Sequence, residues 1–287
     1  MDVLNTSSIM FAVIGDPIKH SMSPIMMNHA FNISGFNGVY TSSLVKSDQL
    51  GAAIEGIRAL GFGGVNVTIP HKVDVMSYCD DIHEDARAIG AVNTIVNDNG
   101  KLIGYNTDGI GYVRSLMEET GTDIKDKVIV MVGAGGAARG VVYALSLQQP
   151  KEIVIANRTL AKAEQLADGI HDVPTRAISL DSVSHDIINE ADIIINNTSV
   201  GMYPHIDETP INLHEIVKPV IVSDLIYNPL ETKWLREAKA KGCVTHSGLG
   251  MFIYQGAYAF EYWTKKQAPV EEMRKVVYES LQNRSKE

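Results

Sequence analysis

The sequence has few cysteines and no long apolar stretch. Its 287 residues include only Cys79 and Cys243, which lie far apart and outside any C-x-x-C pair. This pattern is typical of free thiols in a reducing compartment rather than of a disulfide framework. No apolar run approaches the roughly twenty residues that a transmembrane helix needs. Residues 1–8 lack the basic and apolar regions of a signal peptide. We therefore expect a cytoplasmic protein that does not enter a membrane.

The sequence also lacks an excess of positive charge and a metal-binding pattern. Its formal net charge is −9, from 25 Lys and Arg against 34 Asp and Glu. No basic run contradicts this balance, which argues against a nucleic-acid-binding surface. The nine histidines show neither H-x-x-x-H nor Cys/His spacing, so we expect no metal site. A monomer and a homodimer are both compatible with this composition.

Strand-like and helix-like segments alternate along the chain, which is typical of an α/β protein. Ser23 followed by Pro24 has the pattern of an N-cap residue and a proline at the first helical position. Asn99 and Gly100, between two strand-like runs, predict a hairpin with a type I′ turn. In the first part we expect strands at 9–14, 39–45, 63–68, 92–97 and 101–104, helices at 24–33 and 47–60, and a further helix beginning at Pro70.

A glycine loop at residues 133–138 (GAGGAA) follows an apolar strand-like run and opens a helix-like segment. Its glycines permit a tight turn and a close approach to a pyrophosphate, whose charge then meets the N–H groups at the helix start. Ala138 replaces the third glycine of the dinucleotide-binding fingerprint, and a small residue is tolerated there. A strand at 127–132, a helix at 136–147 and a strand at 153–156 complete a βαβ unit. The segment therefore predicts a dinucleotide site.

The residues after the second strand of this unit indicate which dinucleotide binds. An NAD-binding unit carries an acid there, which accepts hydrogen bonds from the ribose 2′-OH. This chain instead has Asn157, Arg158 and Thr159. An acid repels a 2′-phosphate, whereas Arg158 can bind it with a planar set of donors, and Lys162 can add a second cation. The alternative is a unit that binds nothing, with Arg158 on a solvated face. The position of Arg158 favours NADP, with NAD as a secondary cofactor.

The order of segments predicts two α/β domains with a cleft between them. A doubly wound, Rossmann-like domain of six strands that begins near residue 107 would be complete by about Ser247. We assign residues 107–249 to this domain. Residues 1–106, completed by C-terminal helices within 250–287, would form a substrate-binding domain with a mainly parallel sheet.

Polar residues of the first domain gather after its expected strands, where open α/β sheets bind ligands. Many neutral donors with one lysine and one aspartate suit a small polyhydroxylated acid. Several of these residues also have a purely structural interpretation: Ser23 as a helix cap, Thr68 and Asp108 as turn or cap residues. Lys72 is harder to explain in this way, because a helix start is an unfavourable place for a cation.

The chain resembles the shikimate dehydrogenase family from about residue 9 to the C-terminal helices. The resemblance rests on many segments in the same order, which makes it far more specific than a glycine motif alone. Besides the glycine loop and NRT (157–159), the matching segments are HSMSP (20–24), GVNVTIPHK (64–72), GAVNT (90–94), GYNTDG (104–109), NTSVGM (197–202), DLIYNP (224–229) and GMFIYQG (250–256).

The resemblance implies an NADP-dependent, reversible interconversion of 3-dehydroshikimate and shikimate, a step toward chorismate and the aromatic amino acids. It implies that Lys72 and Asp108 form the catalytic pair and that Ser21 and Ser23 hold the substrate carboxylate. Further substrate contacts are implied for Asn66, Thr68, Asn93, Tyr227 and Gln255. The implied cofactor site comprises Gly133, Ala134, Gly135, Gly136, Ala137, Ala138, Asn157, Arg158, Thr159 and Lys162, with Thr198, Val200, Met202, Gly248 and Met251 around the nicotinamide.

Two other functions remain as alternatives. A quinate/shikimate dehydrogenase that uses NAD or NADP shares much of the pattern, including the stretch from Asn93 to Asp108. A nucleotide-dependent sensor that has lost catalysis is the other alternative. Loss of catalysis would be expected to break the Lys72–Asp108 pair, and both residues are present. The sequence thus favours shikimate oxidation with NADP⁺.

Overall fold

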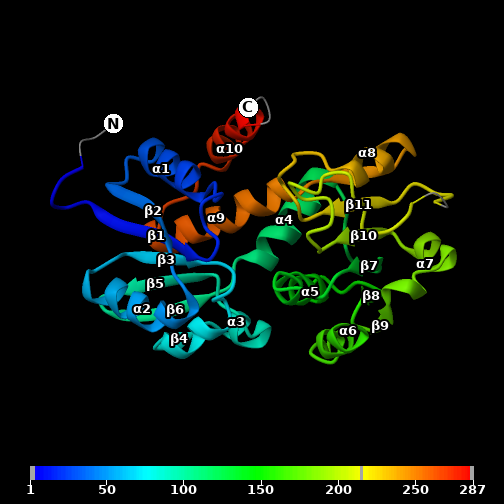
Figure 1. Cartoon of the computed structure of the whole chain (residues 1–287), viewed down its shortest axis with the longest axis horizontal. Coiled ribbons are helices and arrows are strands. Elements are labelled where there is room, and N and C mark those ends of the chain that lie inside the picture. Colours follow the sequence, from blue (N-terminus) through cyan, green and yellow to red (C-terminus); the bar gives the residue numbers. More distant parts are fainter. Residues whose placement is uncertain (1–3, 214–215, 285–287) are drawn as a thin grey trace. The chain divides into compact units, whose positions relative to one another are not determined.

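The chain divides into two compact α/β units. The computed structural model describes residues 4–213 and 216–284. The first unit comprises residues 1–107 and 253–287, and the second comprises residues 108–252. These boundaries lie within three residues of those expected from the sequence, at 106 and 249. Each unit contains one sheet with helices on both faces, as Figure 1 shows.

The first unit is built on a mixed sheet of six strands in the order β2-β1-β3-β5-β6-β4. Strand β1 is parallel to β2 and β3, whereas β5 is antiparallel to β3 and β6. Asn99 and Gly100 have φ values of 52° and 93°, which confirms the turn predicted between β5 and β6. The strands are β1 (Ile9–Gly15), β2 (Gly38–Leu44), β3 (Gly64–Val67), β4 (Asp81–Ile82), β5 (Thr94–Asp98) and β6 (Lys101–Tyr105).

Successive residues of β1 pack against different helix layers, because side chains alternate between the faces of a strand. Phe11 lies 5.1 Å from Phe31, and Phe31 lies 5.7 Å from Phe260, measured between ring centroids. Ala12 and Ile14 belong instead to the core formed with α2. One face thus carries α1 (Ser23–Ile33), α10 (Val270–Arg284) and, from residue 253, α9 (Gly248–Thr264), and the other carries α2 (Leu50–Ala59) and α3 (Glu84–Ile89) (Figure 1).

Two local predictions for the first unit are wrong. The N-cap position of α1 is Met22, with no side-chain cap bond, and Ser23 is already helical; its hydroxyl bonds Tyr40 instead. No α-helix begins at Pro70: residues 69–73 form turns, and a 3₁₀ helix spans Asp74–Tyr78. The carbonyl of Lys72, which an α-helix would use internally, accepts a bond from the backbone N–H of Val92 at 2.8 Å.

The second unit contains six parallel strands in the order β12-β11-β10-β7-β8-β9. Counted within the unit, this is the 3-2-1-4-5-6 order of the doubly wound dinucleotide-binding fold, as predicted. The elements are β7 (Val128–Val132), β8 (Glu152–Asn157), β9 (Thr175–Ser179), β10 (Ile193–Asn196), β11 (Ile221–Asp224) and β12 (Val244–His246), with α4 (Asp108–Thr120), α5 (Ala138–Ser146), α6 (Leu160–Ala167), α7 (His185–Glu190) and α8 (Lys233–Ala240).

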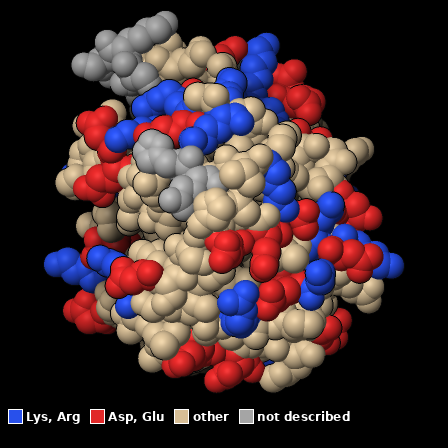
Figure 2. Space-filling view, turned by 90° about the vertical axis from the view of Figure 1, so that its right-hand side faces the viewer, with Lys and Arg blue, Asp and Glu red and all other residues tan. Residues whose placement is uncertain are grey.

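Both faces of this sheet are buried, as its continuous apolar strands require. Ile129 and Met131 of β7 pack in the core that includes α4 and α5. Val130, between them, packs in the opposite core with Trp234 and Leu235 of α8. No described helix is both long and apolar enough to cross a membrane. On the face that Figure 2 shows, Lys and Arg side chains are interspersed with Asp and Glu, and neither sign forms a broad patch.

Candidate functional site

The first unit brings together the segments that carry the predicted substrate residues. The backbone N–H of Thr68 donates to the carbonyl of Ile14 at 3.0 Å, which joins the end of β3 to the end of β1. The N–H of Val67 donates to the carbonyl of Asn93 at 2.8 Å, so the segment before β5 reaches the same edge. Ser21 and Ser23 follow β1, and the N–H of Ser23 donates to the Ser21 hydroxyl at 3.2 Å.

Beneath these residues lies a buried chain of hydrogen bonds centred on Asn66. The Tyr40 hydroxyl donates to Asn66 Oδ1 at 2.6 Å, and Asn66 Nδ2 donates to Thr94 Oγ1 at 3.0 Å. The Thr94 hydroxyl in turn donates to Asn93 Oδ1 at 2.9 Å. All four side chains are buried. Asn66 Nδ2 also donates to the backbone carbonyl of Asn93 at 3.3 Å. Because one end of the Asn66 amide faces a donor and the other faces acceptors, the network determines which end is oxygen and which is nitrogen.

The chain of hydrogen bonds continues through Thr107 to helix α9. Asn93 Oδ1 accepts the backbone N–H of Thr107 at 2.9 Å, and Asn93 Nδ2 donates to Thr107 Oγ1 at 3.0 Å. The Thr107 hydroxyl lies 3.0 Å from the backbone carbonyl of Gln255, to which it donates. The half-buried Gln255 is thereby held next to Asn93. Four of the predicted substrate residues, Ser23, Asn66, Asn93 and Gln255, therefore belong to one network with Tyr40, Thr94 and Thr107.

The sequence-based prediction missed the role of Tyr40. Burial raises the pKa of its hydroxyl well above the usual value, while a hydrogen bond with Ser23 opposes this shift. The phenol therefore stays protonated and can donate to Asn66. Tyrosine is common in strands, so Tyr40 alone gives no signal of a site. Thr94 and Thr107, in contrast, stand beside predicted residues in the motifs GAVNT and GYNTDG.

The two predicted catalytic residues lie at the borders of this network. Lys72 is half-buried in the turn after β3, and its carbonyl bonds Val92, the neighbour of Asn93. Asp108 is the first residue of α4 and is 7% exposed. It directly follows Thr107, whose backbone and hydroxyl are bonded to Asn93. A carboxylate in the first turn of a helix is favourably placed relative to the helix dipole.

The glycine loop of the second unit has the geometry of a phosphate-binding turn. Gly133 has a φ of +103°, and a Cβ there would come within 2.6 Å of Thr198 Cγ2, so only glycine fits. Gly135 and Gly136 are exposed, and a Cβ on Gly136 would meet no atom within 4 Å. The loop continues through Ala137 into α5, whose first residue Ala138 is fully buried. This open space before a helix of nine residues fits a pyrophosphate.

Asn157 shapes the loop, whereas the two cations after β8 remain exposed. Asn157 Oδ1 accepts the backbone N–H of Ala134 at 3.2 Å, and its Nδ2 donates to the carbonyl of Thr159 at 2.9 Å. Arg158 and Lys162 are exposed. Among the described residues, neither side chain forms an ion pair. A 2′-phosphate would suit this pair of side chains, because it would act as their counter-ion.

The loop after β10 packs against the glycine loop and contains three of the residues predicted to surround the nicotinamide. Thr198 and Val200 are half-buried, and Met202 is 45% exposed. Asn197, which the prediction did not include, donates from Nδ2 to the Gly133 carbonyl at 3.3 Å. Its Oδ1 is buried and has no hydrogen-bond partner within residues 4–213 and 216–284. A buried acceptor of this kind suits a ligand hydroxyl or amide, and its motif NTSVGM was the available signal.

The remaining predicted residues of the second unit follow β11 and begin α9. A Cβ on Gly248 would lie 2.1 Å from the Leu225 carbonyl oxygen, so glycine allows the start of α9 to approach β11. Met251 is only 8% exposed and packs in the apolar core of the unit. Tyr227 is half-buried and stacks on Phe252, with 4.6 Å between ring centroids. All three therefore lie near the carboxyl end of β11 or within the core behind it.

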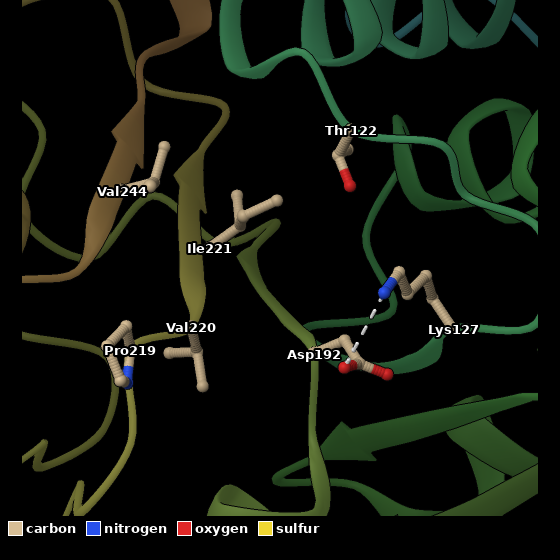
Figure 3. A pocket seen from close by; sticks show the side chains of 7 residues that line it. All are labelled: Thr122, Lys127, Asp192, Pro219, Val220, Ile221 and Val244. Atoms are coloured by element: carbon tan, nitrogen blue, oxygen red, sulfur yellow. Dashed lines mark ion pairs between the residues drawn. The ribbon is translucent and has the colours of Figure 1, made fainter.

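The pocket in Figure 3 lies at the opposite end of this sheet. Lys127 and Asp192 stand directly before β7 and β10, and Val244 begins β12, so the pocket opens at the amino ends of the strands. Its volume is about 200 Å³, and Lys127 Nζ lies 3.9 Å from Asp192 Oδ1. None of the predicted cofactor residues lines it. Among the described residues, no cluster of three or more His, Cys, Asp or Glu is arranged to hold a metal ion.

Three family models match the chain. They are described as the shikimate dehydrogenase substrate binding domain (residues 13–95), shikimate / quinate 5-dehydrogenase (residues 115–215) and the shikimate 5′-dehydrogenase C-terminal domain (residues 248–278). A shikimate dehydrogenase (NADP(+)) from Geobacillus sp. (strain WCH70) is 50% identical over 272 residues. That alignment covers 95% of this chain and 98% of the relative.

Solved structures agree with these matches. A shikimate dehydrogenase in complex with NADP⁺ superimposes with a TM-score of 0.91 at 46% identity, covering 97% of this chain and 98% of the other. A shikimate 5-dehydrogenase from Listeria monocytogenes, in complex with shikimate and NAD, also gives a TM-score of 0.91, at 37% identity over 96% of this chain and 99% of the other. With three family models matched in order, and 50% identity over 272 residues to a relative that the alignment covers to 98%, the chain belongs to the shikimate dehydrogenase family.

Proposed function

We propose that the protein is an NADP-dependent shikimate dehydrogenase that reversibly reduces 3-dehydroshikimate to shikimate. The observation that carries this proposal is the buried network of neutral side chains around Asn66 and Asn93, which ends in Gln255. Amides and hydroxyls with defined orientations recognise a ring that carries several hydroxyl groups. The relatives named above support the same substrate class.

The substrate carboxylate would bind the hydroxyls of Ser21 and Ser23. Their separation is limited by the bond between the Ser23 N–H and the Ser21 hydroxyl. Thr68, Asn93 and Gln255 would hold the ring hydroxyls, and Asn66 would line the same pocket. From the second unit, Tyr227 would contribute its hydroxyl. Orientation matters here because hydride transfer needs the reacting carbon within a few ångströms of its donor.

Lys72 and Asp108 would supply the acid–base chemistry. Bound NADPH provides the hydride for the carbonyl carbon. The carbonyl oxygen then becomes an alkoxide, which the Lys72 ammonium stabilises and protonates; in the reverse direction Lys72 accepts the proton. Asp108 would orient Lys72 and, as an anion, favour its charged form. The Lys72 carbonyl is hydrogen-bonded to Val92, and Asp108 directly follows Thr107, which is hydrogen-bonded to Asn93. Both residues are thus tied to the same segment, which supports their joint action.

The cofactor would extend along the carboxyl edge of the second sheet. The glycine loop and the start of α5 would hold the pyrophosphate, and Arg158 and Lys162 the 2′-phosphate, with Thr159 beside them. Thr198, Val200, Met202, Gly248 and Met251 would surround the nicotinamide. The open space at Gly136, the two exposed cations and the buried acceptor Asn197 Oδ1 all suit this ligand.

Quinate oxidation is the second candidate, since one of the matched family models includes quinate dehydrogenases. Initial rates with shikimate or quinate, each with NADP⁺ or NAD⁺, separate the two functions. We expect dominant turnover of shikimate with NADP⁺. Comparable turnover of quinate with NAD⁺ would assign the chain to the quinate-oxidising class, and no turnover by folded protein would favour a nucleotide sensor.

A further inference from the structure

We infer that Asp224 is a positioning residue for the cofactor: through Asn196, its carboxylate holds the loop after β10 against the glycine loop. The inference rests on the proposed binding of NADP in the second unit. Asp224 ends β11, adjacent to β10, and its side chain has no exposed surface. None of the roles considered above uses it.

Both carboxylate oxygens of Asp224 are occupied. Oδ1 accepts from Asn196 Nδ2 at 3.1 Å and from the backbone N–H of Ile226 at 3.0 Å. Oδ2 accepts from the Thr232 hydroxyl at 2.8 Å. Three donors from three different segments therefore converge on one buried anion. Such an arrangement strengthens each bond, because hydrogen bonds to an ionised acceptor in a poorly solvated site are stronger than neutral ones.

Asn196 transmits this constraint to the loop. With Nδ2 directed at Asp224, Asn196 Oδ1 faces the other way and accepts from Thr198 at both its N–H (3.0 Å) and its hydroxyl (2.7 Å). Asn196 Nδ2 also donates to the Val200 carbonyl at 3.2 Å. Rotation of the Asn196 amide by 180° would break all of these bonds, so the carboxylate selects one of two amide orientations.

The loop in turn contacts the glycine loop. The Thr198 methyl group occupies the space that a Cβ on Gly133 would need, and Asn197 donates to the Gly133 carbonyl. A displacement of Thr198 would therefore shift the turn proposed to bind the pyrophosphate. Asp224 would act on cofactor affinity without touching the cofactor.

Burial opposes the charge on which this arrangement depends. It raises the pKa of Asp224 to about 6, and the bonds from Ile226, Thr232 and Asn196 counter that shift. A carboxylate is thus retained at a position where a neutral amide of the same size would avoid the desolvation cost. A need for an acceptor at both oxygens explains this choice.

Asp192 provides a matched control on the same sheet. It stands before β10, at the amino end lined by the pocket of Figure 3. Like Asp224, it bridges neighbouring strands: its Oδ2 accepts the backbone N–H of Val128 at 2.9 Å. Asp224→Asn and Asp192→Asn are therefore the same chemical change at opposite ends of one sheet.

The test is a fluorescence titration of each full-length variant with NADPH, combined with steady-state kinetics. We expect Asp224→Asn to raise the NADPH dissociation constant roughly 10-fold, the effect of losing a hydrogen bond to a charged group. The KM for shikimate should stay within about twofold, as should both constants in Asp192→Asn. Equal NADPH affinities in the two variants, or parallel changes in the NADPH and shikimate constants, would overturn the inference.

A second variant tests the route and covers the case in which Asp224→Asn fails to fold. Asn196→Ala should weaken NADPH binding selectively, and the double variant should be little weaker than the single ones, because both act through one path. Additive effects would contradict the relay. If the wild-type protein bound no NADPH, the proposed function would fail and the inference with it. If the wild-type protein bound NADPH and the variants bound it equally well, the inference alone would fail.

Discussion

Each unit gathers its predicted functional residues at one edge of its own sheet. The two groups of residues differ in their surroundings. In the first unit, the predicted substrate residues are joined by a buried network of neutral groups, from Tyr40 to Gln255. In the second, the two residues expected to select the cofactor, Arg158 and Lys162, are exposed cations. The predicted substrate site is thus ordered by internal hydrogen bonds, whereas the predicted cofactor site offers positive charge for a ligand to neutralise.

This difference follows from what each ligand has to do. A ring whose carbonyl is to be reduced must be held in one orientation, and a buried network resists reorientation because breaking it strands unpaired groups. The 2′-phosphate distinguishes NADP from NAD by its negative charge and its acceptor oxygens, and exposed cations can recognise both. Variants in the two units should therefore affect separate kinetic constants.

The largest expected effect is that of Lys72→Ala. We predict a decrease in kcat of roughly 10²–10⁴, the usual contribution of a general acid–base group. The dissociation constant of NADPH should be nearly unchanged. Lys101→Ala is the control, since Lys101 is an exposed lysine of the same unit that pairs with Asp81. Turnover equal to wild type would remove Lys72 from the mechanism.

The charge buried in the second unit predicts a pH effect on stability. The pKa of Asp224 is about 6 in the folded protein against an ordinary value of 3.8. Because the folded protein holds this proton more tightly than the unfolded chain, the neutral carboxyl stabilises the fold. This contribution to the free energy of unfolding is complete below pH 3.8 and is lost as the pH rises through 6, a change of about 3 kcal/mol. The free energy of unfolding of wild type, relative to Asp224→Asn, should fall by up to this amount between pH 4 and 7.

Tryptophan fluorescence can assign this change to one unit. The chain has two tryptophans, and Trp234 is fully buried in the second unit. In a Trp263→Phe background, denaturant unfolding followed by fluorescence reports on Trp234. A stability difference that does not vary with pH would contradict the shifted pKa.

Arg158→Ala should separate the two cofactors. Loss of its bonds to the 2′-phosphate should weaken NADP⁺ binding roughly 10- to 100-fold and leave NAD⁺ binding nearly unchanged. Kd values for both dinucleotides provide the measurement, with Arg176→Ala as the control, because Arg176 is a half-exposed arginine paired with Glu152. Equal losses for NADP⁺ and NAD⁺ would disprove recognition of the 2′-phosphate.

The smallest predicted effect is that of Tyr40→Phe. Removing this hydroxyl deprives Asn66 Oδ1 of its donor and should raise the KM for shikimate by about fivefold, equivalent to about 1 kcal/mol. The KM for NADP⁺ should not change. Tyr278→Phe is the control, since Tyr278 is exposed and its hydroxyl accepts a hydrogen bond from Gln282 on the same helix. A wild-type KM would show that the network tolerates the loss of its first member.

Sequence patterns predicted most of the architecture. Apolar periodicity and the glycine loop were sufficient to predict a doubly wound second unit that ends near Ser247, and the C-terminal helices belong to the first unit as expected. Asn99 and Gly100 predicted their turn because positive φ angles restrict the residues that can occupy it.

The errors arose where a tertiary contact overrode a local preference. Ser23 has the composition of a helix cap, but its hydroxyl bonds Tyr40, 17 positions away in the chain. Pro70 suits a helix start, but the Lys72 carbonyl accepts a hydrogen bond from the N–H of Val92 instead of from a later residue of a helix. Tyr40 was missed because strand spacing determines only the face of the sheet on which a side chain lies. Whether a polar atom there finds a partner depends on other segments.

The Asn157 side chain makes two hydrogen bonds, one with Ala134 and one with Thr159. These bonds separate the shape of the glycine loop from the choice of cofactor. The Asn157 amide holds the backbone of the glycine loop at Ala134, whereas the predicted distinction between NADP and NAD would depend on its neighbour Arg158. An engineer could therefore exchange Arg158 for an acid without rebuilding the turn. The same separation would let natural variants of this fold switch between NADP and NAD through a substitution at one position, while the remainder of the domain stays intact.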